Sequence, residues 1–579
     1  MTLYSPEKNV QILVGLLKEA GVSKVVASPG NTNVAFVATI MNDDHFTVYS
    51  VVDERSAGYV ACGLAEALGE PVVLSCTGAT ASRNYLPSMT EAFYRRLPLL
   101  VITSTQPISR VGHLIPQVID RSIIPADAAV CSELLRVVET SQDAQDCAMR
   151  VNRALLALTR RGGGPVHINL ETSLEKPFVS SMGTRGSLIK AVDAPDKIPE
   201  LPGKKIAVFI GSHAPFLDEL SDAIDVFCER NGAVVFCDHS SRFYGKFALH
   251  FSLVAAQSRF EMRQLAPDLV IHIGEISGDY FTPKLFKSAA VWRVSEDGEP
   301  RSPFGRLERV FRMREIDFFN SAPNVTQLAE GADPTYFDKC RDTLITVRER
   351  IPEELPFSNV WIAKQLSGEL PTGSYAHLGI LSSLRAWNFF DVPQNIATSA
   401  NVGGFGIDGP LSTAVGIALA DSQRLVFAYL GDLATFYDLN ILGNRHLPPN
   451  LRILVVNNGK GVEFRHLNHH ASYFGEAADE FVAAAGHNGN MSRAVLRSFT
   501  EALGLLYIAA DSKESFESAA RDFLGETSVD RALMFECFVD PRDEVSAQSM
   551  LLDLVGNARG RVRHAASKTK AALKEKFRP

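Results

Sequence analysis

The chain has 579 residues, of which 46% are hydrophobic and 21% charged, and its formal net charge at neutral pH is −8. This length is too great for a single hydrophobic core and predicts roughly three or four domains. The acidic balance argues against a nucleic-acid-binding surface, and the composition is that of an ordinary globular protein rather than a disordered, fibrous or membrane protein.

The N-terminal segment and the cysteines indicate the compartment. Residues 1–26 read as a helix with Val10, Leu13, Leu16 and Leu17 on one face, and they contain no targeting signal or membrane span. The eight cysteines lie far apart and form no Cys-x-x-Cys pair. This spacing is typical of reduced, mostly buried thiols rather than a disulfide framework or a zinc site. We therefore expect a cytoplasmic protein.

Residues 1–180 alternate short apolar runs with helical stretches. The runs are KVVASPG, PVVLSCTG, LPLLVITS and GPVHINL, and ERSAGYVACGLAEAL is a helical stretch between two of them. Such alternation predicts a parallel sheet covered by helices. The turn residues of SPGNTN and CTGATAS follow two of the runs, and this places them at the carboxyl edge of the sheet, where open α/β folds bind ligands.

Two further blocks repeat the pattern. Residues 190–350 form a central α/β domain, which starts with a linker-like stretch rich in Pro, Lys and Asp at residues 190–205. A third α/β domain, residues 355–555, contains the runs YAHLGI, RLVFAYLGD, RILVVNNG and ALMFECF. The sequence thus predicts an α/β protein with three parallel sheets, each covered by helices. Residues 481–498 are less regular and are either a substrate-covering segment or an ordinary loop.

Residues 556–579 form a basic tail. From Asn557 to Pro579 the chain carries eight Lys or Arg against one Glu. A solvated helix or a frayed end is the favoured interpretation, and contact with a membrane surface or a polyanion is the alternative.

Two oxygen-bearing side chains follow two apolar runs of the third block. Asp432 ends one run, and Asn458 ends the next run 26 residues later. A strand-helix-strand unit of this length returns both strand ends to the same edge of a sheet. Mg²⁺ prefers oxygen ligands, so Asp432, Asn458 and the carbonyl of Lys460 are candidate ligands. The ion would hold a diphosphate near a helix expected at 434–444. The alternative is two turns without a metal.

The ordered motifs of the chain resemble those of thiamine diphosphate enzymes. GDL at 431–433 and NNG at 457–459 are similar to the diphosphate and Mg²⁺ motif of that superfamily. The strongest likeness is to the menaquinone-pathway family of 2-succinyl-5-enolpyruvyl-6-hydroxy-3-cyclohexene-1-carboxylate synthases. It runs through ASPGNTN, VDERSAGYVACGLAEA, CTGATASRNYLPSMTEA, WRVSEDGEPRSPFGR and GIDGPLSTAVGIA. It implies a pyrimidine-binding, a central and a diphosphate-binding domain, with each cofactor held between subunits of a homodimer or homotetramer.

The resemblance also assigns cofactor contacts. Glu54, in DERSAGYV, matches a glutamate that hydrogen-bonds the pyrimidine ring, and Ile407, in GIDG, matches the apolar residue that supports the bent cofactor. Without the resemblance, Glu54 is an ordinary charge at a helix N-terminus and Ile407 a core residue. The other implied cofactor contacts are Thr77, Gly78, Gly431, Asp432, Leu433 and Asn458.

Two arginines that grip carboxylates in the synthase family are absent. Their positions hold Thr32 and Val402. Neither a hydroxyl nor an isopropyl group replaces charge-assisted, bidentate recognition. We therefore expect a reaction other than the synthesis of the menaquinone intermediate.

Other polar residues stand near the expected active site. Arg83, in TASRNYLP, is a candidate to hold the carboxylate of a 2-oxo acid, and Glu463, in GKGVEF, is a candidate to protonate an intermediate. For both, a surface role is the alternative. Gln117 aligns with a family glutamine that faces the intermediate. The remaining candidate substrate contacts are Asn31, Thr32, Asn33 and His113.

The leading hypothesis is a thiamine diphosphate- and Mg²⁺-dependent enzyme that decarboxylates a 2-oxo acid and transfers the acyl carbanion to a carbonyl acceptor. The alternatives are a simple decarboxylase that releases an aldehyde and a non-catalytic cofactor-binding paralogue. The expected partners are small molecules and further copies of the chain, with no nucleic acid and no membrane span.

Overall fold

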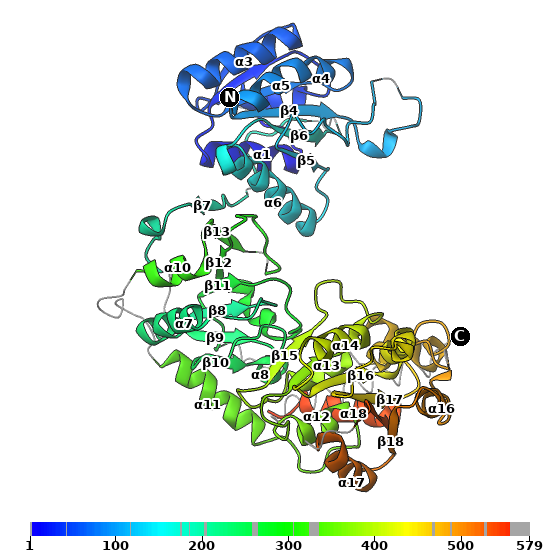
Figure 1. Ribbon diagram of the computed structural model, residues 1–579. Coiled ribbons are helices and arrows are strands. Elements are labelled where there is room, and N and C mark those ends of the chain that lie inside the picture. Colours follow the sequence, from blue (N-terminus) through cyan, green and yellow to red (C-terminus); the bar gives the residue numbers. More distant parts are fainter. Residues whose placement is uncertain are drawn as a thin grey trace, which may run out of the picture. The chain divides into compact units, whose positions relative to one another are not determined.

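The computed structural model describes residues 3–41, 43–115, 117–173, 177–183, 186–201, 205–257, 264–304, 306–323, 335–465, 469–486, 489–525 and 530–555. The chain divides into two compact units, the first formed by Met1–Lys197 with Trp292–Arg314 and the second by Ile198–Val291 with Glu315–Pro579. The chain contains three parallel sheets, which confirms the predicted fold class (Figure 1). The basic tail lies outside the described residues.

The first unit contains a six-stranded sheet with the order β2-β1-β3-β4-β6-β5, in which every pair is parallel. The strands are β1 (Lys24–Ala27), β2 (Thr47–Ser50), β3 (Val72–Cys76), β4 (Leu99–Thr105), β5 (Cys131–Leu135) and β6 (Val166–Glu171). Strands β3, β4 and β6 are buried along their whole length, which explains why their sequences are continuous rather than alternating apolar runs.

Helices cover both faces of this sheet (Figure 1). Helices α1 (Lys8–Glu19), α2 (Val34–Ile40) and α6 (Ser141–Ala157) pack on one face and share one hydrophobic core. Helices α3 (Glu54–Leu68), α4 (Thr80–Asn84) and α5 (Leu86–Arg95) pack on the other face in a second core. The carboxyl edge of the sheet thus lies between two helical layers.

The central sheet has seven strands in the order β10-β9-β8-β11-β12-β13-β7. The strands are β7 (Lys190–Val192), β8 (Ile206–Ile210), β9 (Val234–Cys237), β10 (Ala248–His250), β11 (Leu269–Ile273), β12 (Ala290–Val294) and β13 (Leu307–Phe311). The segment predicted as a linker therefore begins with a strand, because β7 pairs with β13. The neighbouring helices are α7 (Asp218–Asn231), α8 (Ser252–Ala256), α10 (Glu315–Ser321) and α11 (Tyr336–Arg348).

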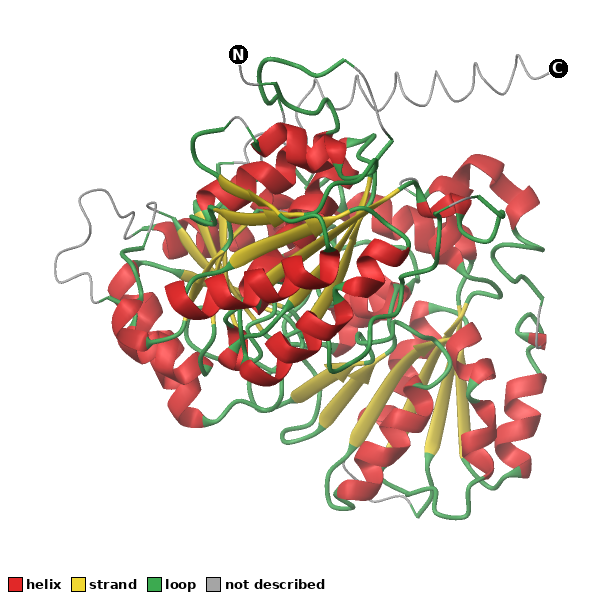
Figure 2. Ribbon diagram, turned by 90° about the horizontal axis from the view of Figure 1, so that it is seen from above, coloured by secondary structure: helices red, strands yellow, loops and turns green. Residues whose placement is uncertain are grey.

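The third sheet, in the second unit, has the order β15-β14-β16-β17-β19-β18, the same topology as the first sheet. Its strands are β14 (Tyr375–Leu378), β15 (Ala397–Ala400), β16 (Val426–Gly431), β17 (Leu451–Asn457), β18 (Leu506–Ala510) and β19 (Leu533–Phe538). Its helices are α12 (Asn359–Leu366), α13 (Ser382–Trp387), α14 (Pro410–Ala420), α15 (Asp432–Tyr437), α16 (Val495–Ala502), α17 (Lys513–Leu524) and α18 (Pro541–Leu551). Helices flank the strands of each sheet when the molecule is coloured by secondary structure (Figure 2).

All eight cysteines are free thiols, and seven of them are buried. Across the described ranges, none of the helices combines the length and the apolar character needed to span a bilayer.

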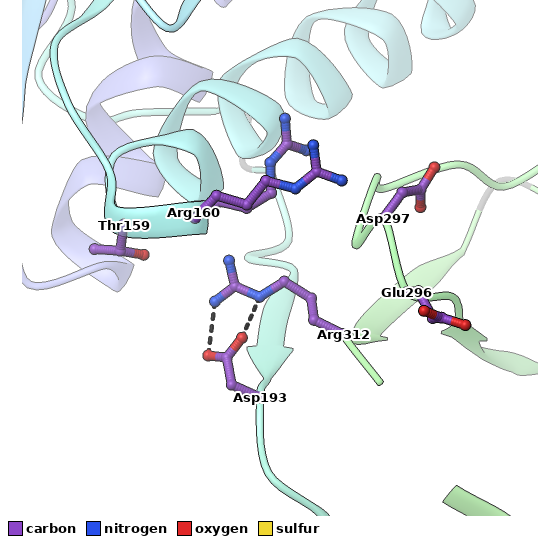
Figure 3. A pocket seen from close by; sticks show the side chains of 7 residues that line it. Thr159, Arg160, Asp193, Glu296, Asp297 and Arg312 are labelled. Atoms are coloured by element: carbon purple, nitrogen blue, oxygen red, sulfur yellow. Dashed lines mark hydrogen bonds and ion pairs between the residues drawn. The ribbon is translucent and has the colours of Figure 1, made fainter. Parts of the chain in front are cut away.

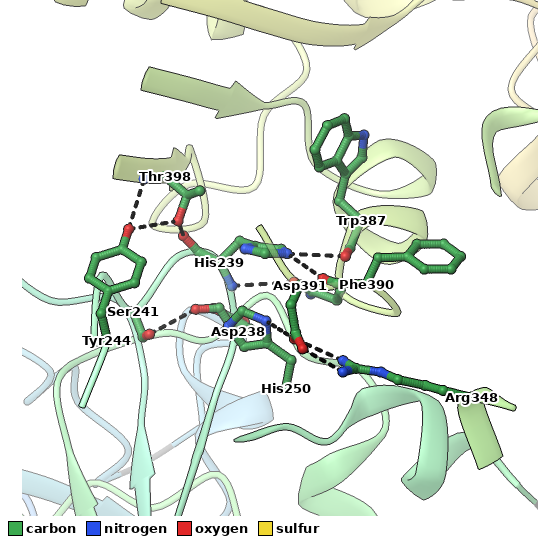
Figure 4. A network of polar contacts seen from close by, with 11 residues as sticks. Asp238, His239, Ser241, Tyr244, His250, Arg348, Trp387, Phe390, Asp391 and Thr398 are labelled. Carbon is green, nitrogen blue, oxygen red and sulfur yellow. Dashed lines mark hydrogen bonds and ion pairs between the residues drawn. The ribbon is translucent and has the colours of Figure 1, made fainter. Parts of the chain in front are cut away.

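Within the second unit, a polar network ties strand β9 to the segment that follows α13 (Figure 4). His239, just after β9, places Nε2 3.1 Å from the carbonyl oxygen of Trp387 and 3.0 Å from that of Phe390. Burial lowers the pKa of His239 to about 3, so the ring is neutral and its Nε2–H donates to these carbonyls. The hydroxyl of Thr398, in β15, donates to the His239 carbonyl at 2.6 Å.

An ionic cluster lies beside this network. His250 Nδ1 is 3.1 Å from Asp391 Oδ1, and Arg348 Nη2 donates to the same oxygen at 2.8 Å. Burial by itself lowers the pKa of His250, but interactions with Asp391 and Cys237 outweigh it and raise the pKa to about 10. Burial likewise raises the pKa of Asp391, and hydrogen bonds from His250 and Arg348 outweigh it and hold the pKa well below its usual range.

The ion pair between His250 and Asp391 should contribute to the stability of the fold in a pH-dependent way. His250 has a raised pKa in the folded state, so its stabilisation is complete below pH 6.5 and is lost as the pH rises toward about 10. Because the Asp391 side chain is 55% exposed, solvent screens the pair and we expect Asp391→Asn to cost only about 1 kcal/mol at pH 6. This cost should shrink by pH 9 in urea denaturation. Asp342→Asn, which removes an exposed charge on α11, is the control, and a pH-independent cost would contradict the assignment.

Candidate active site

Asp432 is the first residue of α15, directly after β16 ends at Gly431. Its side chain is buried, and Oδ2 accepts a hydrogen bond at 2.9 Å from Nδ2 of Asn490. Backbone N–H groups of Leu433 and Gly459 also donate to the carboxylate. Burial outweighs these hydrogen bonds and raises the pKa of Asp432 to about 7. Asn490 comes from the irregular segment 481–498, so this segment reaches the site.

Asn458 follows β17, the parallel neighbour of β16. Its side-chain amide hydrogen-bonds Glu544 in α18, and its Oδ1 accepts from the Lys460 N–H at 3.4 Å. Glu544 is buried, and burial, together with the nearby charge of Asp432, raises its pKa to about 7. Asp432, Asn458 and Glu544 therefore converge at one edge of the third sheet. The sequence reasoning missed Glu544, because nothing in a polar helix distinguishes it from a solvated glutamate.

A second buried glutamate holds the neighbouring asparagine. Asn457 Nδ2 donates to Glu536 Oε1 at 2.6 Å, and Asn457 Oδ1 accepts from the Gly459 N–H at 3.1 Å. The hydroxyl of Tyr507 donates to the other Glu536 oxygen at 2.6 Å. Both asparagine amides of the loop are thus fixed by glutamates from the C-terminal part of the sheet and α18. Sequence analysis did not single out Glu536, although a glutamate inside the apolar run ALMFECF is a signal that could have indicated this contact.

This donor set fits a hard divalent cation. Asp432 offers carboxylate oxygens, Asn458 a carboxamide oxygen, and Lys460 a backbone carbonyl that also accepts from the Val462 N–H at 3.0 Å. Two buried carboxylates lie side by side, and the ammonium of Lys460 is engaged by Asp479 at 2.6 Å rather than by either of them. A cation such as Mg²⁺ would offset the cost of burying these carboxylates.

The helix that follows Asp432 is shorter than predicted. The expected helix at 434–444 is in fact α15, which ends at Tyr437, followed by the 3-10 helix η5 (Leu439–Gly443). Asp438 ends α15 because its carboxylate accepts from the backbone N–H and the hydroxyl of Ser412, each at 2.6 Å. A tertiary contact thus overrides the local helical pattern.

Glu463 lies in the 3-10 helix η6 (Val462–Arg465), just beyond the candidate metal loop. Its two oxygens accept from Nη1 and Nη2 of Arg385 at 2.7 and 2.8 Å. The ring of Tyr280 packs against the same guanidinium, with its centroid 4.6 Å from Cζ. The residue predicted as a proton donor therefore faces an arginine.

Three predicted cofactor contacts of this unit, Gly431, Leu433 and Ile407, are half-buried.

The first unit holds the residues predicted to contact the pyrimidine. Glu54 is the first residue of α3, and the preceding Asp53 caps the helix by accepting from the Ser56 N–H at 2.7 Å. The Glu54 side chain is half-buried, and Oε2 accepts from Asn84 at 3.4 Å. The carboxylate therefore keeps acceptor capacity for another ligand.

Thr32 and Asn33, two predicted substrate contacts, are buried in the carboxyl edge of the first sheet. The Thr32 hydroxyl lies 2.5 Å from that of Thr77 and donates to the Ser104 carbonyl at 2.9 Å. Asn33 Oδ1 accepts from Ser75 at 2.6 Å. Both side chains are thus engaged with their own sheet. Asn31, by contrast, is exposed.

Arg83, Gln117 and His113 are exposed, and the Arg83 guanidinium donates to the Asp120 carbonyl at 3.0 Å. The carbonyl of Gln117 lies next to Gly78, 3.5 Å from where a Cβ on that glycine would stand.

Sequence reasoning missed a second arginine beside Gly78. Arg121 is 4% exposed, and its Nη2 donates to Asn169 Oδ1 at 2.7 Å. Its Nη1 lies 3.6 Å from the Cβ position of Gly78 and has no hydrogen-bond partner within the described ranges. Burial lowers the pKa of Arg121 to about 10. The part of the first unit around Gly78 therefore carries positive charge at Arg83 and Arg121. Nothing in the stretch VIDRS separates Arg121 from a surface arginine.

A cavity of about 300 Å³ in the first unit contains none of the predicted site residues. Within the lining, Arg312 donates to Asp193 at 2.7 Å (Figure 3). Arg160 pairs with Glu299, which lies outside the lining. Its lining residues are Thr159, Arg160, Arg161, Asp193, Glu296, Asp297 and Arg312.

Comparison with known proteins identifies the class to which this site belongs. Residues 8–124 match the family described as thiamine pyrophosphate enzyme, N-terminal TPP binding domain, so the cofactor of the class is thiamine diphosphate. Three similar proteins are named 2-succinyl-5-enolpyruvyl-6-hydroxy-3-cyclohexene-1-carboxylate synthase. The one from Bacteroides thetaiotaomicron is 30% identical over 93% of this chain and 96% of its own length. Those from Phocaeicola vulgatus and Desulfotalea psychrophila are 28% and 30% identical, over 94% and 90% of this chain and 98% and 96% of their own lengths. The chain belongs to the thiamine diphosphate enzymes, in the family that contains these synthases.

The geometry at Asp432 predicts a metal-dependent binding defect. Asp432→Ala removes the carboxylate of the donor set, so calorimetric titration with thiamine diphosphate and Mg²⁺ should show at least about a 100-fold loss of affinity, because a metal-bound carboxylate is lost. Asp421→Asn, an exposed acidic residue after α14, is the matched control. Unchanged Mg²⁺-dependent affinity in Asp432→Ala would contradict the assignment.

Proposed function

We propose that this chain is a thiamine diphosphate- and Mg²⁺-dependent carboligase, which decarboxylates a 2-oxo acid and joins the acyl fragment to a carbonyl acceptor. The convergence of Asp432 and Asn458 at adjoining strand ends, each with its side chain hydrogen-bonded to a buried partner, carries the proposal. Asp432, Asn458 and the Lys460 carbonyl would hold Mg²⁺. Thiamine diphosphate, when bound, supplies the carbanion chemistry that this reaction needs.

The protein's own residues would bind and orient the reactants. We assign to Glu54 the hydrogen bond to the pyrimidine ring, since among the described residues its carboxylate accepts one hydrogen bond, a long one of 3.4 Å from Asn84. Ile407 would support the cofactor, and Thr77 and Gly78 would line the pyrimidine. Gln117 would face the reacting atoms.

The charge of the first unit supports an anionic substrate. Arg83 is exposed, and Arg121 has an unpartnered nitrogen in the described part of the chain, so this half-site can offer cations to a carboxylate. Asn31 and His113, both exposed, are candidate neighbours of that carboxylate. A 2-oxo acid brings the required negative charge.

Two positions support substrates other than those of the synthases. Val402 is 2% exposed and Thr32 is 6% exposed, with its hydroxyl committed to Thr77 and Ser104. Neither presents a group that grips a carboxylate. We propose that the acceptor is not the polyanionic compound used in the menaquinone pathway.

Exposed apolar side chains support self-association. Val52, Tyr59, Val60 and Leu68, on and before α3, are 77%, 48%, 42% and 45% exposed. An apolar surface of this kind next to Glu54 suits an interface between copies of the chain. We propose a cytoplasmic homodimer or homotetramer in which the two cofactor half-sites come from different copies.

Glu54→Gln tests the assignment of the pyrimidine contact. The variant should bind thiamine diphosphate with nearly wild-type affinity in calorimetry, yet its turnover should fall about 100-fold or more, because proton transfer through the carboxylate is lost. Glu66→Gln, on the same helix, controls for the change in charge. Wild-type turnover in Glu54→Gln would exclude this role.

The products separate carboligation from simple decarboxylation. Incubation with pyruvate or 2-oxoglutarate, with and without acceptor aldehydes, should yield a hydroxyketone only when acceptor is present, as detected by mass spectrometry. An aldehyde as the only product under every condition would remove the carboligase assignment and leave a decarboxylase.

A further inference from the structure

The ion pair between Arg385 and Glu463 lies at the edge of the third sheet that holds the candidate metal loop. Arg385 is in α13, after β14, and Glu463 is in η6, after β17 and the asparagine pair. Strands β14 and β17 flank β16, whose end carries Asp432. The pair therefore follows the two strands that flank the strand ending at Asp432.

The terminal nitrogens and one face of the Arg385 guanidinium are occupied. Both Nη atoms of Arg385 donate to Glu463, at 2.7 and 2.8 Å, and the ring of Tyr280 packs on the guanidinium face. The Arg385 side chain is 9% exposed. An adjoining cavity of about 10 Å³, lined in part by Arg385 and Glu544, has room for one water at most. A ligand carboxylate thus finds both Nη atoms of Arg385 already engaged by Glu463.

The other cations of the loop are also paired. Lys460 Nζ lies 2.6 Å from Asp479 Oδ2, and Arg465 Nη1 lies 3.6 Å from Asp479 Oδ1. Over the described residues 458–465, each Lys or Arg thus has a carboxylate neighbour. The spare positive charge found in the first unit has no counterpart in this loop.

We propose that Glu463 determines substrate specificity by occupying Arg385, so that the donor 2-oxo acid carries an uncharged side chain rather than a second carboxylate. The inference rests on the proposed 2-oxo acid chemistry and deepens it. A dicarboxylic donor would have to displace Glu463 from its bidentate contact with Arg385, so it would have to break two charge-assisted hydrogen bonds of 2.7 and 2.8 Å before it could form its own. A neutral, apolar side chain meets no such obstacle.

The same contact argues against Glu463 as a proton donor. Both oxygens of Glu463 accept hydrogen bonds from Arg385, and this bidentate contact engages the whole carboxylate. Its position beside the loop therefore suits charge neutralisation better than acid catalysis.

Releasing Arg385 tests the proposal. In Glu463→Gln, the ratio of kcat/KM for 2-oxoglutarate to that for 2-oxobutanoate should rise about 10- to 100-fold over wild type, as expected for one charge-assisted hydrogen-bonded contact. In Glu463→Gln the new amide could still contact the guanidinium and mask this rise. In that case Glu463→Ala, which removes the contact, should show the rise in the ratio instead. As a readout independent of turnover, glutarate should bind the variants in calorimetry and bind wild type at least about tenfold more weakly.

Two controls make the outcome specific. Glu501→Gln, which removes an exposed charge on α16, should leave the ratio unchanged. The double variant Glu463→Gln/Arg385→Gln should lose the gain, because the gain depends on the guanidinium. If wild type already prefers 2-oxoglutarate, or if the Glu463 variants neither shift the ratio nor bind glutarate, the proposal is wrong. If no 2-oxo acid is turned over, the proposed function fails, and glutarate binding still decides the role of Glu463.

Discussion

The burial of Asp432 is the constraint on which the site depends. A carboxylate that is 3% exposed at the end of a parallel strand has lost its hydration, and the hydrogen bonds that it accepts do not fully compensate, so its pKa rises to about 7. Glu544 lies close enough to add a second negative charge. The protein keeps both carboxylates at the edge where we propose that the cofactor's diphosphate binds, and a bound cation would offset the cost of burying them.

The surrounding structure holds the loop in a single conformation. Asn457 and Asn458 each give their amide N–H groups to a buried glutamate, which leaves each amide oxygen turned toward the loop. Positive φ at Gly459 permits the tight turn that follows them. Buried networks of this kind specify one geometry when every member is satisfied. The precision of the candidate metal site thus comes from Glu536 and Glu544 as much as from its proposed ligands.

The sequence predicted what depends on local pattern. Apolar runs and turn residues were enough for three parallel sheets, and the spacing of Asp432 and Asn458 predicted that they follow neighbouring strands, as β16 and β17 show. Contacts between distant segments were out of reach. Arg385 and Glu463 are 78 residues apart, and neither stretch predicts the other. The early end of α15 likewise depends on Asp438 reaching Ser412, a contact that helical periodicity does not encode.

Charge is distributed unequally between the two half-sites. The first unit presents Arg83 and the partly unsatisfied Arg121, whereas the loop of the second unit pairs Arg385 with Glu463 and Lys460 with Asp479. This difference in charge between two sheets of the same topology supports the proposed 2-oxo acid substrate, which carries a carboxylate at one end.

The most direct test of the account is a crystal structure of the protein grown with thiamine diphosphate and Mn²⁺, with anomalous diffraction used to locate the metal. If Asp432 and Asn458 hold the metal, we expect a single strong peak within coordination distance of their side-chain oxygens and of the cofactor's diphosphate. A peak elsewhere, or Asp432 and Asn458 turned away from a bound cofactor, would contradict it.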